Sequence, residues 1–287
     1  MHLSRILLAA AAACVVAGCS RDTNGVTTVL PPAAFVRFVN LVPDTGAVDF
    51  RTIDGVVDSP SFFGATTPSG APVIGNGADF RQASPYMRMG AGNRHVRVFM
   101  HGTTAAIAST IIFDTTAAFT ADTYYTLAIT GNSRTGASPA FRGVIITDNF
   151  VAPAAGQFGI RVYHGAPSIG AVDIFARVPA SPANPLGTAL FTNVTFRTAT
   201  NYVSLPLAAQ LNLVATATGT TTPVIAEATL PVGVAPTNTT TGIGGSSIAG
   251  SVLTAILVSP SVAGSQAATF GTASFVYLVD RRPPMLP

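Results

Sequence analysis

Residues 35–50 read FVRFVNLVPDTGAVDF, and residues 159–174 read GIRVYHGAPSIGAVDI. The two stretches align without a gap, so that Arg37 corresponds to Arg161 and both stretches carry Gly-Ala-Val-Asp after a turn that contains proline. In each stretch an apolar run of strand-forming residues leads into the turn and then into a second apolar run. The chain therefore contains an internal repeat whose unit begins with strand, turn and strand.

Two further matches extend the repeat over most of the chain. FRQASPY at residues 80–86 corresponds to FRTATNY at residues 196–202, and residues 141–148 correspond more loosely to residues 275–280. Each copy thus ends on an apolar strand that stops at an aspartate. Repeat units of more than about a hundred residues are domains, unlike the short units of a solenoid.

The rest of the sequence favours short strands. Residues 94–100 alternate between polar and apolar side chains, and residues 123–130, 211–216 and 251–259 are rich in apolar and β-branched residues. Turns rich in Gly, Pro, Asn and Asp separate these runs. We expect an all-β chain with two tandem antiparallel β-sandwich domains, immunoglobulin-like or transthyretin-like. A membrane-spanning barrel is the less favoured alternative, because it requires aromatic girdles and strands of about ten residues in one closed circuit.

The N-terminus has the pattern of an exported lipoprotein. Residues 1–5 are weakly basic, and residues 6–16 form an apolar run that fits the hydrophobic region of a signal peptide. This run is too short for a membrane span, which needs about 20 apolar residues. VAGC at residues 16–19 resembles the lipobox of lipoprotein signal peptides, so we expect cleavage before Cys19 and lipidation of its thiol. Ser20 follows in place of aspartate, which by resemblance to sorted lipoproteins implies the outer membrane.

These observations predict five segments along the chain. They are a lipoprotein signal peptide over residues 1–18, a lipidated tether over residues 19–34, a first β-sandwich over residues 35–150, a linker over residues 151–157 and a second β-sandwich over residues 158–287. The linker reads VAPAAGQ, and its proline and small residues suit a short connection between domains. Because each copy holds its own set of strands, we expect each to fold around its own core.

The composition excludes an electrostatic surface for nucleic acid. All 15 basic residues are arginine, they are scattered against 12 acidic residues, and the formal net charge is only +3. The hydrophobic fraction is 48% and the charged fraction 9%, which favours strands and turns over charged amphipathic helices. Cys14 lies in the expected signal peptide and Cys19 would carry the lipid, so we expect no disulfide in the exported protein.

The repeated unit resembles the bacterial domain-of-unknown-function 4397 family. HGAP at residues 164–167 and AVDIF at residues 171–175 carry the resemblance most clearly. The first copy departs from this pattern by a longer insertion and by Asn40 in place of His164. The resemblance covers most of residues 35–283 in two copies and implies tandem sandwich modules on secreted proteins and lipoproteins. It implies no activity and no catalytic residue.

The histidines and aspartates provide few candidates for catalysis. His164 and Asp173 could form a base and its orienting carboxylate, but no Gly-x-Ser-x-Gly nucleophile motif is present and the first copy lacks the histidine. A hydrogen-bonded turn is therefore the favoured interpretation of His164. The glycine-rich stretch at residues 242–245 lacks the lysine and the following helix that a phosphate loop requires.

Metal sites are disfavoured by the spacing of the possible ligands. The histidines lack the close partners of a zinc site, and the acidic residues of the first copy lack the order of an EF-hand loop. We expect these acidic residues to stabilise turns. The residues considered are His95, His101 and His164 for zinc and Asp44, Asp49, Asp54 and Asp58 for calcium.

One charged pair recurs at equivalent positions. Arg37 with Asp49, and Arg161 with Asp173, lie on successive strands joined by a tight turn in both copies. In an antiparallel hairpin the two members of each pair could face one another across the ladder. The alternative is that these are exposed strand charges that coincide in position without interacting.

We expect a non-enzymatic cell-envelope lipoprotein whose β-sandwich modules bind, or present to, an envelope protein or glycan. Two other classes remain open: an envelope hydrolase whose loop active site carries no recognisable motif, and a purely structural scaffold. The expected partners are the membrane, through the lipid on Cys19, and an envelope protein or glycan. We expect no cofactor, no metal and no nucleic acid. The sequence assigns neither binding residues nor an oligomeric state.

Overall fold

The computed structural model describes residues 31–52, 77–178 and 186–282. The signal peptide, Cys19, Asp54 and Asp58 lie outside these ranges. Residues 31–150 are called the first half below, and residues 157–282 the second half. Among the described residues, no helix is long and apolar enough to cross a bilayer.

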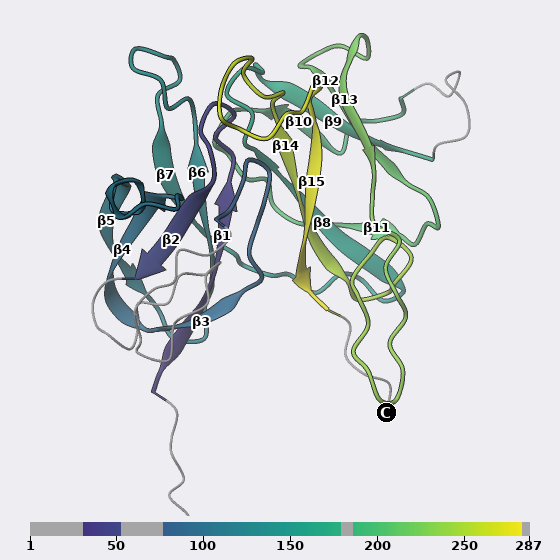
Figure 1. The fold of residues 1–287 in the computed structure, drawn as a ribbon. Helices are drawn as coiled ribbons and strands as arrows, with labels where there is room; N and C mark the ends of the chain where they lie inside the picture. The colour runs from purple at the N-terminus through teal and green to yellow at the C-terminus, as the bar shows by residue number, and fades with distance from the viewer. Residues whose placement is uncertain (1–30, 53–76, 179–185, 283–287) are drawn as a thin grey trace, which may run out of the picture. The chain divides into compact units, whose positions relative to one another are not determined.

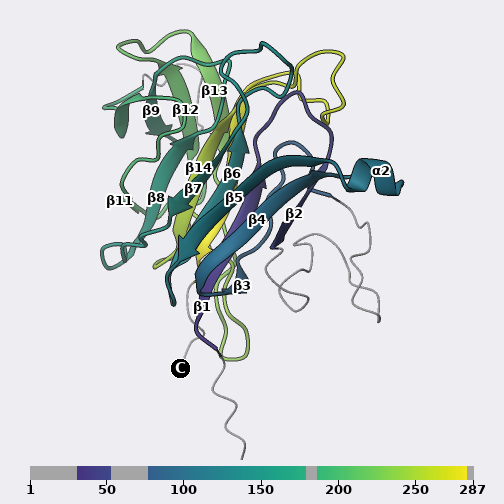
Figure 2. The same ribbon diagram turned by 90° about the vertical axis from the view of Figure 1, so that its left-hand side faces the viewer.

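The first half folds into two sheets (Figure 1). One sheet has the order β3-β1-β6-β7, and its strands are β1 (Ala33–Asn40), β3 (Met87–Gly90), β6 (Tyr124–Thr130) and β7 (Arg142–Thr147). The other has the order β2-β4-β5, with β2 (Val48–Thr52), β4 (Gly92–Met100) and β5 (Ile111–Phe119). A single turn of helix, α2 (Ala105–Ala108), lies at the end of β4 and β5 (Figure 2) and is capped by Thr104.

The second half repeats this arrangement. One sheet has the order β11-β8-β14-β15, with β8 (Gln157–His164), β11 (Val203–Pro206), β14 (Val252–Val258) and β15 (Ser274–Arg281). The other has the order β10-β9-β12-β13, with β9 (Val172–Arg177), β10 (Phe191–Val194), β12 (Asn212–Ala217) and β13 (Val224–Thr229). Strand for strand, β11-β8-β14-β15 corresponds to β3-β1-β6-β7 of the first half.

The all-β sandwich expected from the sequence is confirmed, with one difference in strand direction. β1 pairs with β6 in parallel, and β8 pairs with β14 in parallel, whereas the sequence analysis expected antiparallel sheets throughout. The reason is topological: between β1 and β6 the chain crosses to the opposite sheet as β2, returns as β3 on the other edge of β1, and crosses again as β4 and β5. Such a crossover, unlike a tight hairpin, brings two strands together in the same direction.

The sheets β3-β1-β6-β7 and β11-β8-β14-β15 are called the inner sheets below, and their central strands β1, β6, β8 and β14 are buried on both faces. In β1, the side chains of Ala34, Val36 and Phe38 pack into the core of the first half, while Val39 packs against the second half. β14 is buried along its whole length. A sheet covered on both faces reads as a continuous apolar run, which explains VLTAILV in β14.

A third apolar cluster joins the two halves, which otherwise have separate cores. Its buried members come from both inner sheets and the turn after β1: Val39, Leu41, Ala128, Tyr163, Ile256 and Val258. Residues 32–287 accordingly form one compact unit. The two sandwiches are therefore packed together through their inner sheets and not merely tethered by the linker.

Candidate functional site

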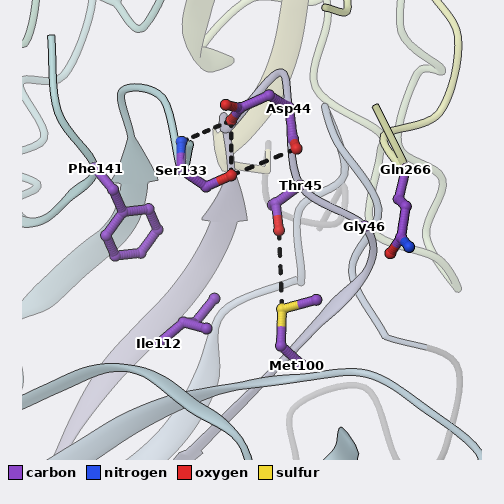
Figure 3. A pocket seen from close by; sticks show the side chains of 8 residues that line it. All are labelled: Asp44, Thr45, Gly46, Met100, Ile112, Ser133, Phe141 and Gln266. Carbon is purple, nitrogen blue, oxygen red and sulfur yellow. Dashed lines mark hydrogen bonds between the residues drawn. The ribbon is translucent and has the colours of Figure 1, made fainter. Parts of the chain in front are cut away.

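A cavity of about 450 Å³ lies where loops of the two halves meet (Figure 3). Seven of the lining residues belong to the first half, and Gln266 comes from the loop between β14 and β15 of the second half. The lining consists of Asp44, Thr45, Gly46, Met100, Ile112, Ser133, Phe141 and Gln266. The cavity is thus composite and depends on the packing of the two halves.

One wall is polar and is organised by Asp44 in the turn between β1 and β2. The Asp44 carboxylate accepts hydrogen bonds from Ser133 N at 2.7 Å, Ser133 Oγ at 3.0 Å and Arg134 N at 3.1 Å. These bonds fix the loop between β6 and β7 onto the turn. With three donors in place, the carboxylate acts as a structural acceptor that holds the two loops together.

The opposite wall is apolar. Ile112 and Phe141 are partly buried and pack against the core of the first half, which holds their side chains in place. Met100 completes this wall, and its sulfur lies 3.8 Å from Thr45 Oγ1. The cavity therefore combines a preformed apolar surface with a small number of polar groups, the usual composition of a ligand pocket.

The loop that carries Gln266 is held against the first half. Val262 N donates to Pro43 O at 2.9 Å, which ties the loop to the turn beside Asp44. Arg81, from the first half, donates to the carbonyl oxygen of Thr272 at 2.6 Å, at the end of the loop. The position of Gln266 is thus set by contacts between the halves.

Arg81 has a counterpart in the second half. Arg81 and Arg197 occupy equivalent places in FRQA and FRTA, and both adopt positive φ, at 70° and 66°. Arg197 reaches into the first half and donates from Nε to Thr130 Oγ1 at 2.8 Å. The guanidinium of Arg81 also lies over the ring of Phe270, at 4.2 Å from its centroid. The repeated Phe-Arg motif therefore forms a reciprocal clamp between the halves.

A buried charge network lies between the inner sheets. Arg37 of the first half forms an ion pair with Asp280 of the second, and Arg161 of the second half forms one with Asp148 of the first. Arg37 Nη2 lies 2.7 Å from Asp280 Oδ1, and the two side chains are 2% and 0% exposed. The Arg37–Asp280 contact is electrostatic, because its angles do not meet hydrogen-bond geometry.

Threonine and tyrosine hydroxyls complete this network in the same way on both sides. Each aspartate accepts hydrogen bonds from one threonine and one tyrosine of its own half, and each arginine donates from Nε to one of these threonines. Burial raises the pKa of Asp280, while the nearby guanidinium of Arg37 acts in the opposite direction. The residues involved are Thr126 and Tyr86 at Asp148, and Thr254 and Tyr202 at Asp280.

Neither interpretation of Arg37 and Asp49 is correct, because the two residues do not pair and both are buried. Asp49 interacts instead with Arg51 at 3.1 Å and with His101 at 3.3 Å. The reason is that β1 and β2 belong to different sheets and are not paired as a hairpin. Arg37 points out of the first sandwich, where its closest carboxylate is Asp280 of the second half, while Asp148 of its own half lies farther away, at 3.9 Å.

Arg161 and Asp173 likewise do not pair, and both are buried. β8 and β9 lie in different sheets, and Asp173 accepts hydrogen bonds from Asn193 N and Gly219 N, both at 2.8 Å. Asp173 therefore stabilises two turns of its own sheet and does not balance the charge of Arg161.

His164 is a structural residue. Its Nε2 donates to Gly170 O at 2.9 Å, its Nδ1 accepts from Ala166 N at 3.3 Å, and burial lowers its pKa. Asn40, the equivalent residue of the first half, likewise donates to a carbonyl, Ala78 O, and accepts from the second residue after it, Val42 N. Each side chain therefore accepts one backbone hydrogen bond within its turn and donates one to a backbone carbonyl. His164 forms no dyad with Asp173.

The other histidines considered as metal ligands form separate pairs with aspartates. His95 interacts with Asp114, and His101 with Asp49. Among the described residues, no group of three or more His, Cys, Asp or Glu side chains is placed to hold a metal ion.

A second cavity of about 460 Å³ lies between the halves and reaches the buried Arg37–Asp280 pair. Residues 83–86 of the first half and residues 277–280 of the second line it, with Arg282. Its polar floor is already occupied by the charge network, so the cavity at Asp44 is the stronger candidate for a binding site. Gln266 and Ser133, which line that site, stand in loops without any motif and were missed by the sequence analysis.

Two solved structures of streptococcal proteins resemble the fold weakly. One is described as alpha-glucan recognition by family 41 carbohydrate-binding modules from streptococcal virulence factors, with 11% identity, a TM-score of 0.23, and coverage of 68% of this chain and 87% of that chain. The other is described as alpha-glucan binding by a streptococcal virulence factor, with 11% identity, a TM-score of 0.21, and coverage of 68% and 86%. Likeness at this level carries no argument about the ligand of this chain.

No curated protein matches the chain. A family model described as a domain of unknown function, DUF4397, matches residues 34–175. The matched range contains all strands of the first half together with β8 and most of β9. The chain thus contains a DUF4397-like domain.

Proposed function

We propose that the chain is a non-enzymatic, lipid-anchored envelope protein whose paired sandwiches bind an envelope glycan or protein at the cavity beside Asp44. The observation that carries this proposal is the composite cavity, which has a fixed apolar wall and a polar rim contributed by both halves. Loops at the end of a rigid sandwich are the usual place for recognition.

Binding is favoured over catalysis by the chemistry of the lining. Asp44 is the ionisable residue of this cavity, and three donors of the loop between β6 and β7 already bind its carboxylate. A general base or nucleophile needs a positioned partner within hydrogen-bond reach. Ser133 Oγ donates to the Asp44 carboxylate and has no histidine beside it in the lining, so the pair resembles a turn contact and not a hydrolase site.

The second half is proposed to be a second DUF4397-like domain. The support is its sheet order, which repeats that of the first half, together with the matching Arg161, Tyr202 and Asp280 in the buried network. The anchor is proposed at Cys19, in the outer membrane, on the basis of the lipobox-like residues and Ser20. On this proposal the tether would hold the paired domains near the membrane surface.

Capture from envelope extract tests the binding function. The mature chain, immobilised at its C-terminus, is expected to retain an envelope protein or glycan, and the variant Gln266→Ala to retain at least several-fold less. Gln210→Ala, an exposed glutamine outside the lining, is the matched control. Equal retention by Gln266→Ala and the mature chain would place binding elsewhere, and no specific retention at all would favour the scaffold role.

A further inference from the structure

We propose that the cavity beside Asp44 takes a neutral sugar ring, stacked on Phe141 and hydrogen-bonded by Gln266. This inference rests on the proposed binding function and names the chemical class of its ligand. The support comes from the charges, the surfaces and the hydrogen-bonding groups of the residues that line the cavity.

The charges of the lining favour a neutral ligand. None of the 8 lining residues is basic, so an anionic ligand finds no cationic partner in the cavity. The carboxylate of Asp44 is turned toward Ser133 and Arg134, and the residue is only 8% exposed, so a cation in the cavity reaches it poorly. A charged ligand would lose its hydration without compensation, which a neutral ligand avoids.

The apolar wall suits a flat ring with one apolar face. Phe141 and Ile112 pack against the core of the first half, so their surfaces are in position before a ligand arrives. Figure 3 shows the Phe141 ring and the Gln266 side chain on opposite sides of the cavity. A pyranose presents C–H groups on its faces and hydroxyls around its edge, which fits an aromatic platform opposite a polar group.

The polar side offers hydrogen bonds of both kinds. The carboxamide of Gln266 has two donor hydrogens and one acceptor oxygen, and within the described part of the chain it makes no hydrogen bond of its own. Gly46 lies beside it, since a Cβ at Gly46 would stand in ordinary contact with Gln266 Oε1, at 3.4 Å. Thr45 Oγ1 is engaged only by the Met100 sulfur, a weak acceptor that a sugar hydroxyl can replace.

The equivalent place in the second half is filled differently. In the aligned repeat Ile169 stands where the first half has Thr45, and Ile169 packs against the core of the second half. Ser168 stands where the first half has Asp44, and its hydroxyl contacts Ser259 Oγ at 2.9 Å. The polar features of the sugar site therefore belong to the first half and to the Gln266 loop that covers it.

Direct titration of the soluble mature chain tests the inference. The protein begins at residue 20, so that it lacks Cys19, and it is titrated by calorimetry and NMR with maltotriose, cellotriose, mannotriose and tri-N-acetylchitotriose. The charged probes are chitosan trimer, a cation, and trigalacturonic acid, an anion. At least one neutral trisaccharide is expected to bind with a Kd near or below about 1 mM, and both charged trimers at least tenfold more weakly.

Variants locate the site. Phe141→Ala is expected to weaken the sugar at least tenfold, Phe141→Tyr to keep most of the affinity because it keeps the ring, and Gln266→Ala to weaken it several-fold. Gln210→Ala is expected to leave it unchanged. Because Phe141 also touches the core, Gln266→Ala is the variant whose fold is least at risk, and thermal unfolding of each variant is measured alongside.

The outcomes separate this inference from the proposed function. If no neutral trisaccharide binds at 10 mM, or if binding survives both Phe141→Ala and Gln266→Ala, the inference is overturned. If Gln266→Ala abolishes capture from envelope extract while none of the sugars binds, the ligand is a protein and only the sugar assignment fails. If neither experiment responds to Gln266→Ala, the cavity is not the binding site and both proposals fail.

Discussion

Arg37 of the first half and Asp280 of the second half form a buried ion pair with 2.7 Å between Nη2 and Oδ1. The corresponding residues Arg161 and Asp148 form the reverse pair, from the second half to the first. Each half therefore places one arginine and one aspartate in the interface. The closest opposite charge to each of these side chains belongs to the other half. The two copies of the sequence repeat therefore contribute equivalent residues to the interface, each pairing with the other copy.

Breaking one side of this network is expected to be costly. Arg37→Ala leaves Asp280 buried without its closest cation, so we expect the free energy of unfolding to fall by about 3–5 kcal/mol. Arg97→Ala removes a partly exposed partner of Asp114 and is the control, with a much smaller expected loss. Chemical denaturation of both variants provides the comparison. Equal losses for the two variants would contradict the assigned role of Arg37.

The two halves are expected to depend on one another. Residues 34–150 and 157–287 each have their own core, but alone each would expose a charged and apolar face that the other half now covers. We expect the separate fragments to be less stable than the whole chain and to form a complex when mixed. Size-exclusion chromatography and far-UV circular dichroism measure both effects. Two stable monomeric fragments that ignore one another would refute this expectation and support independent modules.

Arg81 is expected to hold the loop that carries Gln266. Arg81→Ala removes its hydrogen bonds to Ser259 O and Thr272 O, so we expect hydrogen exchange at Val262 N to rise by about tenfold or more. Arg282→Ala, which removes an exposed arginine, should leave this exchange unchanged. Unaltered protection of Val262 in Arg81→Ala would show that the contact with Pro43 alone fixes the loop.

His164 is expected to make stability depend on pH. Burial lowers its pKa in the folded chain, whereas in the unfolded chain it binds a proton near its ordinary pKa of 6.5. The unfolded state therefore takes up the proton first, and the free energy of unfolding should fall as the pH drops below 6.5, by up to about 1.4 kcal/mol per pH unit.

His164→Asn isolates this contribution, because the equivalent Asn40 also accepts from the second residue after it and donates to a carbonyl, that of Ala78. We expect the variant to remain folded at pH 7 and to lose less stability than the parent between pH 6.5 and pH 5. Urea denaturation at several pH values measures the difference. Parallel pH profiles for parent and variant would mean that other groups cause the acid sensitivity.

Cys19→Ser tests the proposed anchor. Without the thiol no diacylglycerol can be attached, so we expect loss of labelling by a radioactive or alkyne fatty acid and release from the membrane fraction. For the parent chain, density-gradient fractionation should place the labelled protein in the outer membrane. Labelling that persists in Cys19→Ser would exclude this residue as the site of lipidation.

The sequence by itself determined where several of the strands lie, among them β1, β4, β6, β8, β12 and β14, and which side chains alternate along them. The alternation in β1 separates Ala34, Val36 and Phe38 from Arg37, and the apolar run in β14 predicts a strand buried on both faces. The equivalence of Arg37 with Arg161 was also visible, because an internal repeat preserves position along the chain.

Only the tertiary structure decided what lies opposite each face. The sequence left open whether Arg37 meets Asp49, twelve positions along; the chain changes sheets at the intervening turn, and the closest carboxylate is that of Asp280. Phe141 and Gln266 likewise share a cavity although they belong to different halves. Strand periodicity is a local property of the backbone, whereas the choice of facing sheet depends on packing energy summed over distant residues, which no local pattern records.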